Sequence, residues 1–244
     1  MKKIIFWTAL ISVLGLLIGA CAKRDDDTAV TKWTVSCEDT TASGSITIGS
    51  DTASGTYLVL TGNEFYNSRP ATGCNATTDH YGSPTGTQSV LQKKIITSST
   101  SFVDHESYYS DTACTSRLGY LEKRYSNLSV GDTVSGLDNS SGGRPTSGYR
   151  VTYKPECAKI MADTDAAMVT FNTAYAAFFH IYPMTTGTEK AFCETWACQV
   201  QTYYSIWGAG DNGTTFSIYQ AMGGSAGYDP SDWDANSGGM TFQK

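Results

Sequence analysis

The pentapeptide Gly223 to Gly227 has the spacing of a nucleophilic serine. Its sequence, GGSAG, matches G-x-S-x-G, a turn that exposes a serine hydroxyl between a strand and a helix, so Ser225 is the candidate nucleophile. However, Pro230 follows where the helix should begin, and every histidine of the chain precedes Ser225. The repeated strand–helix alternation of such enzymes is also missing. We therefore predict that the protein is not an enzyme.

Oxygen-bearing side chains alternate near the end of the chain. Asp232, Asp234 and Asn236 occupy every second position, a spacing at which carboxylate and amide oxygens can surround Ca²⁺. The glycine and the glutamate that complete an EF-hand loop are replaced by Ser237 and Gln243. An acidic surface loop explains this pattern better, so we predict no bound metal and no cofactor.

The tripeptide Asp104 to Glu106 places the imidazole of His105 between two carboxylates. On a strand, Asp104 and Glu106 would share one face and His105 would point to the other. That arrangement favours neither a His–Asp relay nor a metal site. A polar strand face is the simpler interpretation.

A cysteine near the N-terminus, Cys21, is a candidate for covalent modification of its thiol. Two lysines precede an apolar run from Ile4 to Ala20, and Cys21 follows directly. A positive start and an apolar run of this length indicate a signal peptide rather than a membrane span. The tetrapeptide Ile18 to Cys21 resembles the bacterial lipobox, which implies removal of residues 1–20 and attachment of a diacylglyceryl group to Cys21. The alternative is an ordinary signal peptide that is cleaved after Ala20.

An acylated Cys21 would place the protein in the cell envelope. Each buried methylene contributes about 0.8 kcal/mol, and the two or three chains of a lipoprotein suffice for stable anchoring. Ala22, where an aspartate would favour retention in the inner membrane of enteric bacteria, favours the outer membrane. Residues 21–30 would then be a tether, and residues 31–244 would be one exported domain.

An acylated Cys21 could not form a disulfide, and six cysteines, an even number, would then remain. In an oxidising compartment, six cysteines predict three disulfides, for which 15 pairings are possible. The six are Cys37, Cys74, Cys114, Cys157, Cys193 and Cys198. Cys193 and Cys198 are the best local pair, because they would close a small loop. Zinc binding is the competing use of these thiols, but the chain has no Cys-x-x-Cys pair.

The composition excludes some partners. Without Lys2 and Lys3 the chain has 15 basic and 23 acidic side chains, a net charge of −8. No basic stripe is present, so we predict no nucleic-acid binding. Anionic headgroups would repel the domain, so the lipid must provide the attachment to the membrane.

Segments of alternating hydrophobicity must position these residues. The alternation predicts β-strands through most of the chain. The clearest segments are residues 89–97, 100–109, 148–154, 198–207 and 214–222. The first two are joined at Ser98 and Ser99 and predict a hairpin. We therefore expect a mainly β fold, an antiparallel barrel or sandwich.

One helix is predicted near residues 164–180. Met168, Phe171, Tyr175 and Phe178 recur at steps of three and four, which is one face of a helix. Asp163, Thr164 or Asp165 could be its N-cap. We expect the apolar face to pack on the sheet.

Three further features resemble a known family. Trp33 and Cys37, the aromatic run of residues 57–66 and the segment Tyr108 to Cys114 resemble lipocalin-type barrels of the adenomatosis polyposis coli down-regulated (APCDD) family. The resemblance covers about 80 residues. It implies a lipocalin-like barrel whose base Trp33 closes, a ligand cavity, and a disulfide between Cys37 and Cys114.

Together these observations predict a lipid-anchored protein of the cell envelope that is not catalytic. Its β-domain, rich in tyrosine, would bind a small apolar ligand or another envelope component. A surface adhesin or structural interaction protein without a cavity is the alternative. A serine hydrolase that uses Ser225 is the third hypothesis.

Overall fold

The computed structural model describes residues 36–61, 73–76, 83–136, 147–179, 183–193, 201–210, 215–220 and 240–244. The chain divides into two compact units, Met1–Thr34 and Val35–Lys244, and all the described residues belong to the second. No helix among these residues is long and apolar enough to span a membrane.

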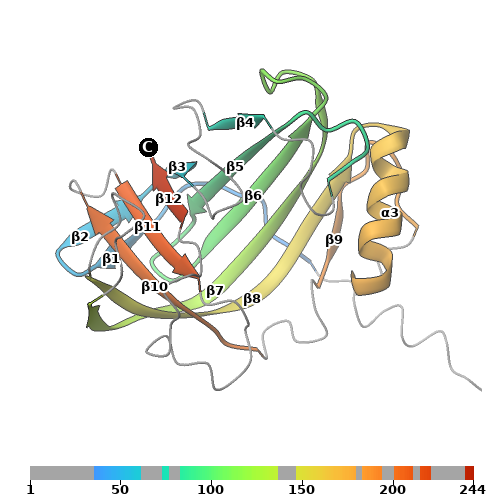
Figure 1. Ribbon diagram of the computed structural model, residues 1–244. Coiled ribbons are helices and arrows are strands. Elements are labelled where there is room, and N and C mark those ends of the chain that lie inside the picture. The colour runs from blue at the N-terminus through green and yellow to red at the C-terminus, as the bar shows by residue number, and fades with distance from the viewer. Residues whose placement is uncertain are drawn as a thin grey trace, which may run out of the picture. The chain divides into compact units, whose positions relative to one another are not determined.

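The described part is built mainly from β-strands, with one helix (Figure 1). The elements are β1 (Ser45–Ile48), β2 (Asp51–Ser54), β3 (Thr56–Thr61), β4 (Cys74–Ala76), β5 (Ser89–Ile96), β6 (Phe102–Tyr109), β7 (Arg117–Ser135), β8 (Ser147–Ala162), α3 (Asp165–Phe179), β9 (Lys190–Phe192), β10 (Tyr203–Gly210), β11 (Thr215–Gln220) and β12 (Met240–Gln243). The prediction of a mainly β fold with one helix near 164–180 is confirmed.

Among the described residues, all strand pairs are antiparallel. β1 and β2 form a separate hairpin, and one large sheet has the order β10-β11-β12-β3-β5-β6-β7-β8-β9, with β4 beside β5. The long strand β8 has two neighbours on one side, because residues 149–153 pair with β10 and residues 158–160 pair with β9. The pairing with β10 joins the sheet to itself at one end, which we call the closed end. At the other, open end, β4 and β9 are the outer described strands, so the sheet is not closed along its whole length.

An aromatic core fills the closed end. Phe102 of β6 lies at its centre, with ring centroids 4.9 Å from Tyr125, 5.1 Å from Tyr153 and 5.0 Å from Trp207. Ile46 and Ile48 of the β1–β2 hairpin are buried in the same core. The side chains of the domain therefore occupy the interior at this end.

A second core lies at the open end, where α3 covers the sheet (Figure 1). Phe171 of α3 is fully buried there and contacts Tyr108 of β6 edge-on, with centroids 5.8 Å apart. Gly119 permits this close packing, because a Cβ at that position would lie 2.9 Å from the Phe171 ring and 2.5 Å from the Met161 carbonyl oxygen. The expected packing of the apolar helix face on the sheet is confirmed for Phe171 and Met168.

The helix α3 begins with a capping residue at one of the predicted positions. Thr164 Oγ1 accepts a hydrogen bond from the Ala167 backbone N–H at 3.2 Å, so Thr164 is the cap among the three candidates. The hairpin predicted around Ser98 is also present, because β5 and β6 pair in register from Ser89–Tyr109 to Ile96–Phe102.

Two disulfides correct the pairing that the APCDD resemblance implied. Cys37 is bonded to Cys157 and Cys74 to Cys114, so the expected Cys37–Cys114 bond is wrong. The reason is spatial: Cys114 lies in the loop after β6, where it meets Cys74 of β4, whereas the partner of Cys37 is Cys157 on β8, in register with Arg124 of β7. Cys193 is also disulfide-bonded, and Cys198 lies outside the described residues.

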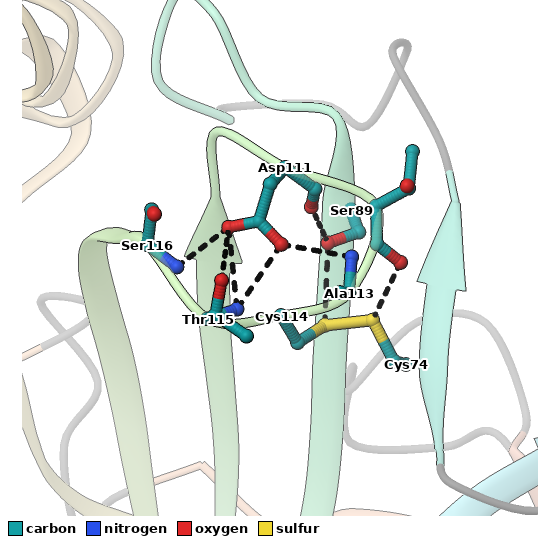
Figure 2. Close-up of a disulfide and its surroundings, with 8 residues drawn as sticks. Cys74, Ser89, Asp111, Ala113, Cys114, Thr115 and Ser116 are labelled. Carbon is teal, nitrogen blue, oxygen red and sulfur yellow. Dashed lines mark hydrogen bonds between the residues drawn. A yellow bond between two sulfur atoms is a disulfide. The ribbon is translucent and has the colours of Figure 1, made fainter.

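The Cys74–Cys114 bond is supported by the loop that holds it (Figure 2). The Asp111 carboxylate accepts hydrogen bonds from the backbone N–H groups of Ala113 at 2.8 Å and Ser116 at 2.6 Å. It also accepts hydrogen bonds from the backbone N–H and the side-chain hydroxyl of Thr115. Desolvation alone would raise the pKa of Asp111, but these hydrogen bonds together lower it to about 2. This arrangement orders the loop in which Cys114 adopts a left-handed conformation with φ of 55°.

Candidate functional site

The inner face of the sheet carries a row of polar side chains between its two cores. Along β6, Phe102 belongs to the aromatic core and Tyr108 to the second core, and Asp104 and Glu106 point the same way between them. We call Asp104 and Glu106, together with their register partners Lys94 and Gln92 on β5, the polar floor. The prediction that Asp104 and Glu106 share a face is confirmed.

The members of the polar floor contact one another. The Lys94 ammonium forms an ion pair with the Asp104 carboxylate. Gln92 donates a hydrogen bond to Glu106 Oε1 at 2.8 Å, and the Tyr108 hydroxyl donates one to Glu106 Oε2 at 3.2 Å. The ion pair is asymmetric, because the Lys94 side chain is 4% exposed and that of Asp104 is 41% exposed. The polar floor therefore reaches solvent through Asp104.

Lys94 lies against the aromatic core. Its Nζ atom lies 4.1 Å from the centroid of the Phe102 ring and 5.6 Å from that of Trp207, both within the range of cation–π attraction. Burial lowers the pKa of Lys94, and the charge and hydrogen bond of Asp104 offset this only in part. Burial also raises the pKa of Tyr153, and the Asp104 charge adds to this effect.

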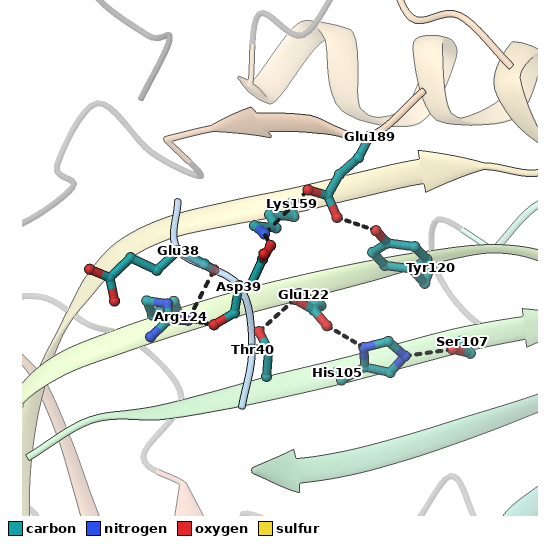
Figure 3. A network of polar contacts seen from close by, with 10 residues as sticks. All are labelled: Glu38, Asp39, Thr40, His105, Ser107, Tyr120, Glu122, Arg124, Lys159 and Glu189. Carbon is teal, nitrogen blue, oxygen red and sulfur yellow. Dashed lines mark hydrogen bonds and ion pairs between the residues drawn. The ribbon is translucent and has the colours of Figure 1, made fainter. Parts of the chain in front are cut away.

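The outer face of the same strands holds a separate polar network (Figure 3). His105 Nδ1 lies 2.8 Å from Glu122 Oε1, and His105 Nε2 lies 2.6 Å from Ser107 Oγ. Burial alone would raise the pKa of Glu122, but hydrogen bonds from His105 and Thr40 lower it below its usual value. Asp104 and Glu106 point away from His105 as predicted, and the carboxylate beside His105 is instead Glu122 of the neighbouring strand β7, a partner that was not predicted.

Glu122, His105 and Ser107 are linked in the order carboxylate, imidazole, hydroxyl, as in a catalytic triad, but their side chains are not accessible to a substrate. A nucleophilic serine must reach a substrate carbonyl. Ser107 is 2% exposed, and His105 and Glu122 are each 15% exposed at their side chains. The three residues thus form a structural chain of hydrogen bonds within the sheet.

Residues 37–40, which we call the strap, cross β8 and β7 on this outer face (Figure 3). Arg124 donates hydrogen bonds to the carbonyl oxygens of Glu38 and Asp39 at 3.0 and 3.2 Å. Lys159 pairs with Asp39 at 3.0 Å, and Thr40 donates to Glu122 at 2.8 Å. With the Cys37–Cys157 bond, these contacts attach the start of the described chain to the sheet.

Most of the sites proposed from the sequence lie outside the described residues. These are the acylation candidate Cys21, the nucleophile candidate Ser225 and the calcium candidates Asp232, Asp234 and Asn236. Trp33, His80 and His180 also lie outside them. Among the described residues, no group of three or more His, Cys, Asp or Glu side chains could hold a metal ion.

Lys94 is not among the site residues predicted from the sequence. A signal was present, because Val90, Gln92, Lys94 and Ile96 alternate within the predicted strand and both apolar members point to the core. Lys93, its neighbour, pairs with His105 on the outer face.

No protein-family model matches the chain, and a search of curated proteins finds no match. The functional proposal below therefore depends on the residues of this chain alone.

Proposed function

We propose that the protein is a lipoprotein of the cell envelope, anchored through Cys21 in the outer membrane, whose β-domain binds a small ligand without catalysing a reaction. The ligand would have an apolar body and one polar end. The polar floor would hold that end, and the apolar side chains on either side of the floor would contact the body. An adhesive or structural role without a ligand is the second candidate, and the packed aromatic rings at the closed end favour it.

The polar floor is the observation that supports ligand binding. Removing a charged pair from water carries a penalty that its mutual attraction often does not exceed, and apolar residues at such positions are often equally or more stable. The Lys94–Asp104 pair lies between two apolar cores, where a domain selected only for stability would be apolar. Exposure of Asp104 gives a ligand access to the pair.

Titration with octanol, a single-chain compound with one polar end, tests this proposal. We expect saturable binding to the purified full chain, and Asp104→Ala should weaken it about tenfold or more, because the floor loses its accessible polar group. Lys93→Ala is the matched control, since Lys93 adjoins the floor in sequence but lies on the outer face. If neither octanol nor octanoate binds saturably, the ligand proposal is wrong and the adhesive role is favoured.

The anchor has its own test. Cys21→Ala should abolish incorporation of labelled palmitate and release the protein from membranes, because the thioether can no longer form. Cys21 and Cys37 are 16 residues apart, so the tether can extend at most about 55 Å before the strap begins. Palmitate labelling that survives Cys21→Ala would contradict the anchor.

A further inference from the structure

We propose that Lys94 is the attachment point for a carbonyl-bearing apolar ligand, which it holds as an imine. This inference rests on the proposed ligand-binding function and specifies its chemistry.

The surroundings of Lys94 suit an imine. Its Nζ atom lies beside the buried Phe102 and Trp207 rings, which keep water away from the amine, and Asp104 provides the counter-ion. Lysines that form imines in proteins are typically desolvated, because only the neutral amine is nucleophilic. The lowered pKa of Lys94 increases the fraction of neutral amine.

Asp104 is placed to transfer protons to and from the Lys94 nitrogen during imine formation. The carboxylate contacts the Lys94 ammonium and is also the exposed member of the pair, so it can exchange a proton between the amine and solvent. The described ionisable side chains that point to this face also include Glu106, with Lys123 in register with Asp104 on β7 and Tyr57 in register with Lys94 on β3, and the core tyrosines Tyr108, Tyr125, Tyr153 and Tyr203. Glu106 accepts hydrogen bonds from Gln92 and Tyr108, whereas the Asp104 carboxylate contacts the Lys94 amine directly and is therefore the candidate acid–base group.

The reaction balances with the aldehyde as the only co-reactant. The neutral Lys94 amine attacks the carbonyl carbon and forms a C–N bond, while the carbonyl oxygen takes a proton and becomes a hydroxyl. The nitrogen then loses its remaining proton, the hydroxyl leaves as water, and a C=N bond remains. Protonation of the imine restores a positive charge beside Asp104, so the ion pair of the unliganded protein is retained.

Other lysines provide internal comparisons. Lys93 precedes Lys94 directly but lies on the outer face in register with His105. Lys159 is also buried, yet its two carboxylate partners, Asp39 and Glu189, raise its pKa despite the opposing effect of burial. Selective reaction at Lys94 would therefore reflect its surroundings and not the mere presence of an amine.

Reductive trapping tests the proposal. The full chain is incubated with octanal and cyanoborohydride, which reduces an imine to a stable secondary amine, and the adducts are located by peptide mass spectrometry. We expect the occupancy of Lys94 to exceed that of Lys93 about tenfold or more. Lys94→Arg should remove this adduct and keep the positive charge beside Asp104, whereas Lys93→Arg should leave it unchanged. Near-ultraviolet circular dichroism verifies that both variants are folded.

Two outcomes would overturn the inference. One is adduct formation spread evenly over the lysines, and the other is no adduct at Lys94 in a folded chain. If octanol binds and Asp104→Ala weakens it, but octanal is not trapped at Lys94, only this inference fails. If octanol does not bind either, the proposed ligand-binding function fails with it.

Discussion

Replacement of both Cys37 and Cys157 by alanine is expected to lower the free energy of unfolding by about 4 to 5 kcal/mol. This disulfide links residues 120 positions apart, and the entropy of the unfolded chain that such a link removes grows with the length of the closed loop. Replacing both residues avoids a free thiol. Urea unfolding without reductant, followed by tryptophan fluorescence, measures the difference from the midpoint and slope.

The second disulfide is the control for this experiment. Cys74 and Cys114 are 40 positions apart, so alanine at both should cost about 1 kcal/mol less than the change at Cys37 and Cys157. A larger loss at Cys74 and Cys114 would show that loop length does not dominate. It would mean that the ordered loop around Asp111 contributes more than the strap does.

The Cys37–Cys157 bond also has a mechanical consequence for the proposed anchor. The strap is the first described segment after the tether, and it is held by the disulfide, by Arg124 and by Lys159. Cys157 and Lys159 lie on β8, which pairs with β7, β9 and β10. If Cys21 is acylated as proposed, a pull on the lipid would therefore be transmitted to strand β8.

Phe102→Ala is expected to destabilise the domain by about 3 to 5 kcal/mol, the range for removing a buried aromatic ring. Phe102 is 1% exposed and contacts three other aromatic rings at the closed end. It also lies beneath the Lys94 ammonium, so its loss removes a cation–π contact. Thermal and urea unfolding of the purified variant would measure this change.

Two substitutions calibrate the effect of Phe102→Ala. Phe102→Leu retains most of the apolar volume and should cost less than the alanine change. Val169→Ala, at a helix position that is 59% exposed, should change stability by no more than about 0.5 kcal/mol. Equal stability of Phe102→Ala and Val169→Ala would contradict a packed aromatic core at the closed end.

The local elements could be predicted because their signals lie within a few residues. The helix depends on apolar residues three and four apart and on the Thr164 hydroxyl, which is three residues from the N–H that it caps. The β5–β6 hairpin depends on two alternating segments joined by a short turn. In both cases the interacting groups are neighbours along the chain.

The site could not be predicted, because its contacts cross between strands. Alternation indicates that Asp104 and His105 point to opposite faces, but it does not show which residue of another strand lies opposite each. The partner of His105 is Glu122, and that of Asp104 is Lys94, both fixed by register across the sheet. Cysteine pairing failed for the same reason, since Cys157 is 120 positions from Cys37.

The amino-acid sequence alone determined the mainly β character, the position of the helix with three candidate caps, and the even number of cysteines beyond Cys21. These properties follow from local patterning and from composition. The tertiary structure alone decided that the sheet joins to itself at one end, that the strap is attached to β8, and that Lys94 is buried beside Phe102 and paired with Asp104. The physical reason is that long-range strand register places side chains on the same face and at the same height, and no short stretch of sequence contains that information.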